Sequence, residues 1–177
     1  MTIALVTGAS RGIGKAIALQ LADDGMDVAV NDIQTQLAEL EAVKTAIEQK
    51  DVSKEDEVIK MVESTVNELG ELNVMIANAG IIVAKTMFEV SVEEWDRVQA
   101  VNVRGAFLCY REAGRQMIKQ GKGGKIVGAC STAGHRPSGN TFAYGVSKWA
   151  VRGLTQSAAI ELAKHDINVN GKLGDLP

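Results

Sequence analysis

The amino-acid sequence predicts an α/β fold, a doubly wound parallel sheet with helices on both faces. Two patterns point to it: short, nearly continuous apolar runs, and between them longer segments whose apolar residues have helical spacing. Apolar residues make up 46% of the 177 residues and charged residues 23%, which suffices for a sizeable core. The length fits one domain, so residues 1–177 are expected to form a single domain.

The N-terminal half begins with a strand over residues 3–7, which leads into a glycine-rich turn. A helix over 13–22 follows, and a second strand covers 28–30. Helical spacing of five apolar residues then predicts a second helix, marked by Leu37, Leu40, Val43, Ala46 and Ile47. Ser53 and Asp56 have the spacing of an N-terminal cap, so a further helix is expected to start there.

The second half continues the alternation of strands and helices. A strand is expected over 72–77, before a helix that Ser91 and Glu94 would cap and that runs to about Lys119. The next strand covers 125–130, a second long helix covers 142–164, and a last strand begins over 167–169. Strands joined in this way by helices form a parallel sheet that is covered on both faces.

Composition and charge argue against several classes of protein. The net charge is −3 and the sequence pI is about 5.5, so we expect no nucleic-acid-binding surface. We expect no membrane association, because no apolar run is long enough to span a bilayer. Two cysteines and an N-terminus without room for a signal peptide favour a cytoplasmic protein. His135 and His165 are isolated in the sequence, so no metal site is expected.

A glycine-rich turn lies between the first strand and the first helix, with the sequence Thr7-Gly-Ala-Ser-Arg-Gly-Ile-Gly14. Its three glycines allow a tight turn and a close approach of the backbone to a ligand. The following helix offers free N–H groups and the positive end of its dipole to a phosphate. Placed between a strand and a helix, the turn indicates a dinucleotide site. The alternative is a turn that serves only the packing of helix against strand.

The end of the second strand bears on the choice of cofactor. Asp32 follows Gly14 by 18 residues, where a carboxylate can bind both ribose hydroxyls of adenosine and repel a 2′-phosphate. Arg11 favours the opposite choice, since a cation in the glycine loop could pair with that phosphate. We expect NAD, because Asp32 should lie nearer the ribose, and NADP stays open as the alternative. A solvated turn residue is the other interpretation of Asp32.

A tyrosine and a lysine on the last long helix suggest acid–base chemistry. Tyr144 and Lys148 are four residues apart and therefore share a helix face. An ammonium near a phenol stabilises the phenolate, so the hydroxyl can exchange a proton with a carbonyl or an alcohol. Ser131 follows the strand over 125–130, and its hydroxyl could meet the same substrate oxygen.

These segments together resemble the short-chain dehydrogenase/reductase family, in its common compact form. The resemblance extends to about Asn170 and rests on the Thr7–Gly14 turn, Asn78-Ala-Gly80, Asn102, Ser131 and Tyr144-x-x-x-Lys148. It implies that Tyr144 is the general acid/base and that Lys148 assists it and holds the nicotinamide ribose. It also implies that Ser131 binds the substrate oxygen and that Asn102 holds a water in the proton relay.

The same resemblance implies a set of cofactor-binding residues spread over most of the chain. Asp51 and Val52 resemble the pair that contacts the adenine. The residues expected along the cofactor are Gly8, Ser10, Arg11, Gly12, Ile13, Gly14, Asp32, Asp51, Val52, Asn78, Gly80, Tyr144 and Lys148.

The segments 128–135 and 150–156 are most similar to the acetoin/diacetyl reductase branch of the family. This similarity suggests a small vicinal diketone or hydroxyketone as substrate, and the residues themselves indicate redox chemistry between a carbonyl and an alcohol. A 3-oxoacyl thioester is the alternative, because the Thr7–Gly14 turn fits that branch equally well. Apolar residues surround most of the helix over 142–163, which favours a homodimer or homotetramer.

The sequence departs from the family at two places, so the domain is expected to be incomplete. The family's third strand has no counterpart between Lys50 and Asp51, and the lid that follows the last strand has none after Asn170. Only three residues would connect helices on opposite faces, and three residues span at most about 11 Å. Residues are therefore expected to be missing at Lys50–Asp51 and near Asn170–Gly171. The alternative function is a truncated, catalytically impaired module for dinucleotide binding or interaction.

Overall fold

A computed structural model describes residues 1–33, 46–137 and 139–174. Its strands are β1 (Ile3–Thr7), β2 (Asp27–Asn31), β3 (Ala46–Glu48), β4 (Val74–Ala77), β5 (Gly124–Ser131) and β6 (Ile167–Gly174). Its α-helices are α1 (Gly12–Asp23), α2 (Glu55–Leu69), α3 (Val92–Gln99), α4 (Gly105–Gln120) and α5 (Phe142–Leu162). A π-helical turn (Ala100–Arg104) and 3₁₀ turns at 132–134, 139–141 and 163–165 join them.

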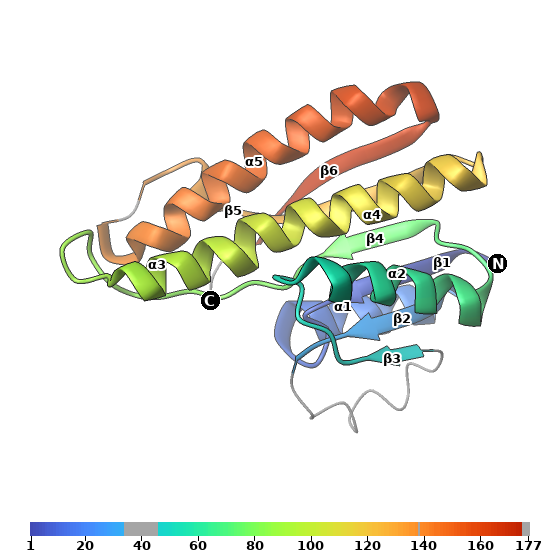
Figure 1. Cartoon of the computed structure of the whole chain (residues 1–177), viewed down its shortest axis with the longest axis horizontal. Coiled ribbons are helices and arrows are strands. Elements are labelled where there is room, and N and C mark those ends of the chain that lie inside the picture. The colour runs from blue at the N-terminus through green and yellow to red at the C-terminus, as the bar shows by residue number, and fades with distance from the viewer. Residues whose placement is uncertain (34–45, 138, 175–177) are drawn as a thin grey trace.

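The strands form one parallel sheet in the order β3-β2-β1-β4-β5-β6 (Figure 1). The order reverses beside β1, which pairs with β2 on one side and with β4 on the other. At such a switch point the loops leave the strands in opposite directions, and a crevice opens at the carboxyl ends of the strands. The predicted doubly wound α/β fold is confirmed.

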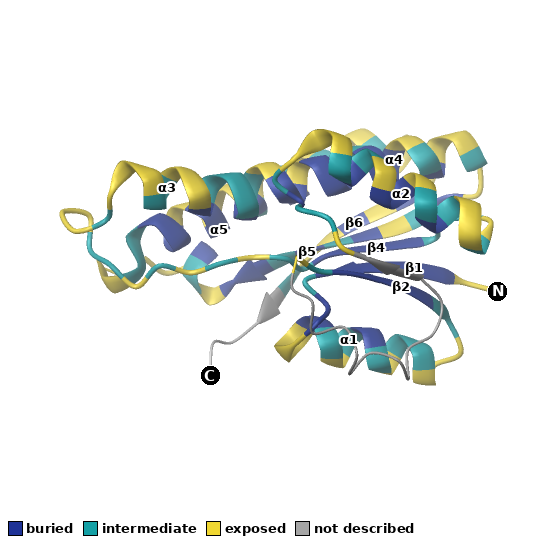
Figure 2. Cartoon of the chain, turned by 60° about the horizontal axis from the view of Figure 1, so that its bottom comes forward, coloured by how far each residue is buried: buried dark blue, intermediate teal, exposed yellow. Residues whose placement is uncertain are grey.

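Helices cover both faces of the sheet, and each face has its own core (Figure 2). On one face α1 lies against β1, β2 and β4, where Val6, Val28 and Ile76 are buried with Ala18 of the helix. On the other face α2, α4 and α5 lie over a larger core that includes Leu5, Met61, Met75, Met117 and Ile126. Most of the strand residues are buried, as expected of a sheet enclosed by helices.

The expectation that the third strand is absent was wrong. Ala46–Glu48 forms β3 at the edge of the sheet, in register with residues 29–31 of β2. The second predicted helix is therefore wrong at Ala46 and Ile47, and its residues 37, 40 and 43 lie outside the described part of the chain. A strand at the edge removes the reason for expecting residues to be missing at Lys50–Asp51.

The predicted break near Asn170–Gly171 is also contradicted. β6 runs through both residues, and they pair with consecutive residues of β5, Val127 and Gly128. The last predicted strand is thus longer than expected, because regular pairing with β5 continues to Ser131.

The caps of the two middle helices differ in how well the sequence predicted them. The capping box at Ser91 and Glu94 is confirmed: the Ser91 side chain accepts a hydrogen bond from the Glu94 N–H, and the Glu94 side chain accepts one in return. The cap predicted at Ser53 is wrong, because α2 begins at Glu55 with Lys54 as its N-cap. The Ser53 hydroxyl instead donates to Asp51 Oδ1 at 2.7 Å.

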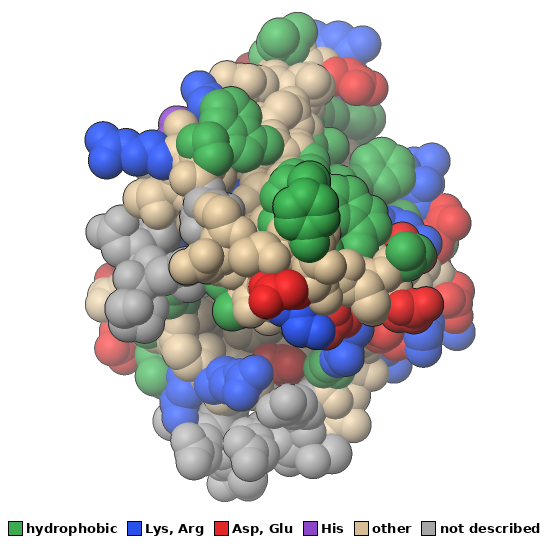
Figure 3. All heavy atoms as spheres, turned by 90° about the vertical axis from the view of Figure 1, so that its left-hand side faces the viewer, with side chains coloured by type: hydrophobic (Ala, Val, Ile, Leu, Met, Phe, Trp, Pro, Cys, Tyr) green, Lys and Arg blue, Asp and Glu red, His purple; other side chains and the backbone are tan. Residues whose placement is uncertain are grey.

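Apolar side chains gather on the end of the molecule formed by α3, the loop before it and the start of α5 (Figure 3). The large exposed apolar side chains of that loop and of α3 are Ile82, Met87, Phe88 and Val92, of which Phe88 is 92% exposed. Within the described ranges, the structure contains no helix that is long and apolar enough to cross a membrane.

Candidate functional site

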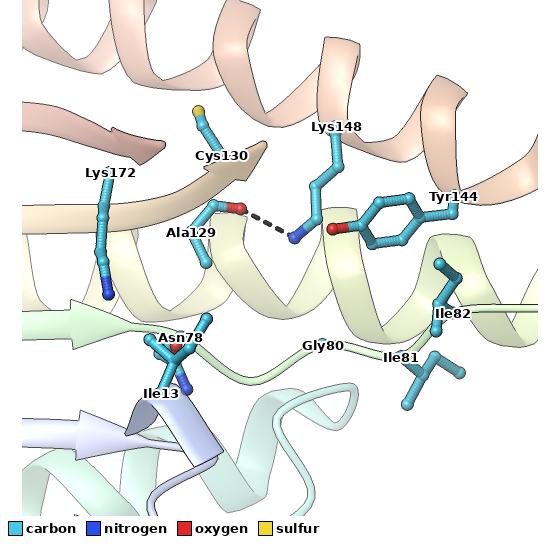
Figure 4. Close-up of a pocket in the computed structure, with 10 residues that line it drawn as sticks. All are labelled: Ile13, Asn78, Gly80, Ile81, Ile82, Ala129, Cys130, Tyr144, Lys148 and Lys172. Carbon is cyan, nitrogen blue, oxygen red and sulfur yellow. Dashed lines mark hydrogen bonds between the residues drawn. The ribbon is translucent and has the colours of Figure 1, made fainter. Parts of the chain in front are cut away.

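Two connected cavities lie at the carboxyl ends of the strands. The larger, here called the groove, has a volume of about 580 Å³ and runs along the loops that follow β1, β2, β3 and β4. The smaller, here called the inner cavity, has a volume of about 170 Å³ and reaches β5, β6 and α5 (Figure 4). Both are lined by Ile13, Asn78, Gly80 and Ile81, so the two spaces are continuous.

The structure brings most of the predicted site residues into these two spaces. The groove is lined by the following predicted residues: Gly8, Arg11, Gly12, Ile13, Gly14, Asp32, Asp51, Val52, Asn78 and Gly80. Tyr144 and Lys148 line the inner cavity. Ser10, Asn102 and Ser131 are buried and line neither space.

The glycine turn is closely packed against its surroundings. A Cβ at Gly14 would lie 2.0 Å from the carbonyl oxygen of Gly8, and a Cβ at Gly8 would lie 2.9 Å from Cα of Ala79. Gly8 and Gly12 also have positive φ angles of 65° and 54°, which disfavour other residues. The turn therefore needs glycine at 8 and 14 for reasons of space, as well as for its approach to a ligand.

Asn78 and Thr7 hold the turn against the loop that follows β4. The Asn78 side-chain amide donates to the carbonyl oxygens of Thr7 at 3.1 Å and of Gly8 at 3.2 Å. The Thr7 hydroxyl accepts hydrogen bonds from the N–H groups of Asn78 and Ala79, both at 3.1 Å. Because Thr7 ends β1 and Asn78 follows β4, these bonds fix the width of the crevice at the switch point.

Asp32 and Ser10 connect the end of β2 to the same turn. Asp32 Oδ2 accepts hydrogen bonds from the Ser10 N–H at 3.0 Å and from the Ser10 hydroxyl at 2.6 Å. Asp32 Oδ1 accepts a hydrogen bond from the Ile33 N–H at 2.7 Å. The carboxylate is thus fixed at the wall of the groove, which the exposed Arg11 also lines.

The far end of the groove depends on Asn31, whose role the sequence did not reveal. Its side chain is buried and exchanges two hydrogen bonds with the backbone of Lys50, at 2.9 and 3.1 Å. This amide extends the pairing between β2 and β3 beyond Glu48 and places Asp51 and Val52 at the groove. The only signal in the sequence is an asparagine directly after an apolar run. Its partner Lys50 is 19 residues away, so no local pattern identifies it.

Tyr144 and Lys148 face the inner cavity from one side of α5, as their spacing predicted (Figure 4). Lys148 Nζ lies 5.2 Å from the centroid of the Tyr144 ring and donates a hydrogen bond to the Ala129 carbonyl at 2.7 Å. Only 4% of the Lys148 surface is exposed, and this burial lowers the pKa of its ammonium from 10.5 to about 8.

Asn102 lies in the π-helical turn between α3 and α4, a local irregularity that is common at functional sites. Its side chain accepts a hydrogen bond from the Ile81 N–H and donates to the Ile81 carbonyl, at 2.8 and 2.9 Å. It also donates to the Ser147 hydroxyl at 2.9 Å, and Ser147 in turn donates to the Tyr144 carbonyl at 2.6 Å. Asn102 therefore links the wall of both cavities to the helix that presents Tyr144.

Ser131 occupies the end of β5, where its hydroxyl accepts a hydrogen bond from the Ala133 N–H at 3.2 Å. Its neighbour Cys130 lines the inner cavity, and burial raises the pKa of the Cys130 thiol. Lys172 of β6 lines the same cavity, and no sequence motif marked it. Cys130 and Lys172 complete the wall opposite Ile13.

The groove meets the physical requirements of a dinucleotide. The three glycines of the turn present backbone without a side chain, and the N-cap residue Arg11 makes no side-chain hydrogen bond to the first turn of α1. The first N–H groups of that helix can therefore bind a phosphate. Asp32 is placed to accept ribose hydroxyls at one end, and Lys148 can donate to hydroxyls at the other. Fold and groove are those expected of a dinucleotide-binding α/β domain.

Comparisons with known proteins agree with this class. A family model described as short chain dehydrogenase matches residues 2–172. A short-chain dehydrogenase/reductase of Armillaria gallica is 51% identical, over 95% of this chain and 68% of its own length. The chain therefore belongs to the short-chain dehydrogenase/reductase family, whose members are oxidoreductases.

Further relatives differ in the substrates that their names give. A diacetyl reductase of the (S)-acetoin-forming type and a 3-oxoacyl-acyl-carrier-protein reductase, both of Staphylococcus epidermidis, are each 39% identical over 94% of this chain. The chain covers 68% and 71% of their lengths. The crystal structure of an NAD⁺-bound xylitol dehydrogenase matches with a TM-score of 0.93 and 36% identity, over 98% of this chain and 70% of that one.

Proposed function

We propose that the protein is an NAD-dependent oxidoreductase that interconverts a small ketone or diketone and its alcohol. One observation carries the proposal: Tyr144 and Lys148 face an inner cavity that continues into a groove lined by the glycine turn and Asp32. A proton donor and a dinucleotide can therefore meet at one substrate carbonyl group, the first at its oxygen and the second at its carbon.

Each residue has a defined task in this reaction. The dinucleotide would supply or accept the hydride. Tyr144 exchanges a proton with the substrate oxygen, and the Lys148 ammonium beside its ring stabilises negative charge there. Lys148 also donates to the nicotinamide ribose, which requires it to leave or share the Ala129 carbonyl. Ser131 binds the substrate oxygen, and this task requires its hydroxyl to turn from Ala133 toward the inner cavity.

The cofactor choice rests on Asp32. Its carboxylate is held at the wall of the groove by Ser10, where it can accept two ribose hydroxyls but would repel a 2′-phosphate. Arg11 is exposed to solvent, whereas Asp32 is held in place by three hydrogen bonds. This difference supports NAD over NADP.

The inner cavity supports a small substrate. Its volume of about 170 Å³ admits a diketone such as diacetyl, and its walls at Ile81, Ile82 and Cys130 are apolar. A 3-oxoacyl thioester is the alternative, because Ile82 is 44% exposed and a longer chain could extend along it toward solvent. Diacetyl and acetoacetyl thioesters are the two substrates to compare.

A second candidate function is dinucleotide binding without turnover. It is favoured by the arrangement around Ser131, whose hydroxyl is buried and does not line the inner cavity. NADH oxidation with diacetyl, followed by absorbance, distinguishes the two functions. The enzyme requires turnover that Tyr144→Phe lowers by at least about 100-fold while NADH binding is retained. If the protein binds NADH but turns over neither diacetyl nor acetoacetyl thioesters, its function is dinucleotide binding without catalysis.

We also propose that the protein forms a homodimer or a homotetramer. Val146, Trp149 and Ile160 on α5 are 39%, 45% and 82% exposed, although one apolar stripe suffices to cover the sheet. Phe107 and Ile118 on α4 are exposed as well. Light scattering should give a mass of at least two chains, which Trp149→Glu should lower toward that of one chain.

A further inference from the structure

Lys172 is placed in the inner cavity by the pairing of the last two strands. It is directly opposite Ala129 in the register of β5 and β6, so both side chains point to the same face of the sheet. Both residues line the inner cavity together with Tyr144 and Lys148. Figure 4 shows the Lys172 side chain extending across β5 toward the side of the cavity where Asn78 and Ile13 lie.

The described residues that line the inner cavity include two lysines and no acidic side chain. The ammonium of Lys148 is bonded to the Ala129 carbonyl, whereas no hydrogen bond or ion pair of Lys172 is found among the described residues. Lys172 is half-buried, and a charge in such a position interacts more strongly with an anion than a fully solvated charge does. Within the described part of the chain, the positive charge of Lys172 at this cavity therefore has no acidic partner.

The opposite wall contributes further positive potential. Ile13, which lines this wall, is the second residue of α1, and the first turn of that helix has no side-chain cap and no acidic residue. The N-terminal turn of α1, through Ile13, and the Lys172 side chain thus border one space from two sides. This arrangement suits an oxyanion between them.

We propose that Lys172 binds an oxyanion, a phosphate or a carboxylate, in the inner cavity. This inference rests on the proposed dinucleotide-dependent function and goes beyond it, because it adds an anion-binding residue on β6. Two sources supply such an oxyanion: the pyrophosphate of the cofactor and the carboxylate of an acidic carbonyl substrate. The direction of the side chain, toward Asn78 and Ile13 and away from Tyr144, favours the pyrophosphate.

The cofactor arm of the test measures binding, without turnover. NADH and ADP-ribose, which share the pyrophosphate, are titrated calorimetrically into the wild type, Lys172→Gln, Lys172→Arg and Lys125→Gln. Lys125 is the matched control, since it is an exposed lysine of β5 outside both cavities. With a pyrophosphate as ligand, Lys172→Gln should raise both dissociation constants by roughly 10-fold. The dissociation constants of Lys172→Arg should stay near those of the wild type, and those of Lys125→Gln should equal the wild-type values.

The substrate arm compares pyruvate with diacetyl, one charged and one neutral carbonyl compound. If the oxyanion is a substrate carboxylate, Lys172→Gln leaves NADH binding unchanged and raises KM for pyruvate by roughly 10-fold, with little effect on KM for diacetyl. Equal urea midpoints for all variants show that the fold is intact.

The proposal is overturned if Lys172→Gln behaves like Lys125→Gln in both arms. It is also overturned if the wild type binds neither NADH nor ADP-ribose, because no oxyanion then enters the cavity. A wild type that binds ADP-ribose but never oxidises NADH refutes the proposed enzyme alone. In that case the comparison of the four proteins with ADP-ribose still decides the role of Lys172.

Discussion

Replacement of Lys148 by methionine should make the folded protein more stable near neutral pH while it removes cofactor binding. The Lys148 ammonium is buried at the inner cavity, and burial lowers its pKa from 10.5 to about 8. Methionine has a similar length and no charge, so it occupies the same space without the cost of burying an ammonium.

The magnitude follows from the two pKa values. A pKa of about 8 in the folded chain and 10.5 in the unfolded chain corresponds to about 3 kcal/mol of destabilisation below pH 8. Lys148→Met also loses the hydrogen bond to the Ala129 carbonyl, and the unpaired acceptor costs the variant about 1–2 kcal/mol. Lys148→Met should therefore raise the free energy of unfolding at neutral pH by about 1–2 kcal/mol.

The pH dependence identifies the cause. Between about pH 8 and 10.5 the unfolded chain keeps the lysine proton and the folded chain loses it, so the unfolded state binds more protons. The stability of the wild type must then rise with pH over this interval, and Lys148→Met lacks this rise. The advantage of the variant should be largest below pH 8 and shrink as the pH approaches 10.5.

Urea unfolding of both proteins without cofactor, at about pH 7 and about pH 10, provides the test. Lys125→Met is the control, because that side chain is exposed and its replacement should leave the pH dependence unchanged. A stability difference between Lys148→Met and the wild type that is the same at both pH values would refute the reasoning. A variant that is less stable than the wild type at pH 7 would refute it as well.

Three further predictions concern the groove and the core. Asp32→Ser should reduce the preference for NADH over NADPH, measured as the ratio of the two kcat/KM values. An unchanged ratio would show that residues other than Asp32 set this preference. Gly14→Ala should abolish NADH binding and cost on the order of 1–3 kcal/mol, because its Cβ would lie 2.0 Å from a loop carbonyl. Gly153→Ala, with nothing within 4 Å of its Cβ, should keep NADH binding and serves as its control. Tyr110→Phe removes a buried hydrogen bond to Thr155 and should lower the free energy of unfolding, measured with urea, by about 1 kcal/mol. An unchanged free energy of unfolding would show that this hydrogen bond contributes no net stability.

Local patterns in the sequence predicted the features that depend on neighbouring residues. The apolar runs that form β1, β4 and β5, the glycine turn and the capping box of α3 are each set within a few residues of chain. The shared face of Tyr144 and Lys148 follows from helix geometry in the same way. For these features, spacing along the chain translates directly into positions in space.

The edge of the sheet shows where local patterns mislead. Ala46 and Ile47 have a spacing from Val43 that fits a helix, yet they form a three-residue strand. Three residues are too few to show the apolar–polar alternation of a strand. The pairing of this strand with β2 depends on the rest of the sheet, which local patterns do not describe. The Asn31 amide then prolongs this pairing to Lys50, a contact that no local pattern indicates.

The sequence by itself determined the class of the fold, the glycine turn and the shared face of the tyrosine–lysine pair, because each depends on the periodicity or backbone freedom of one short segment. The tertiary structure alone decided which distant groups share the inner cavity. It joined Asn102 to Ile81 and to α5, buried the ammonium of Lys148, and brought Lys172 opposite Ala129. The physical reason is that a desolvated charge or a hydrogen bond between strands depends on distances that only the packed sheet and its helices define.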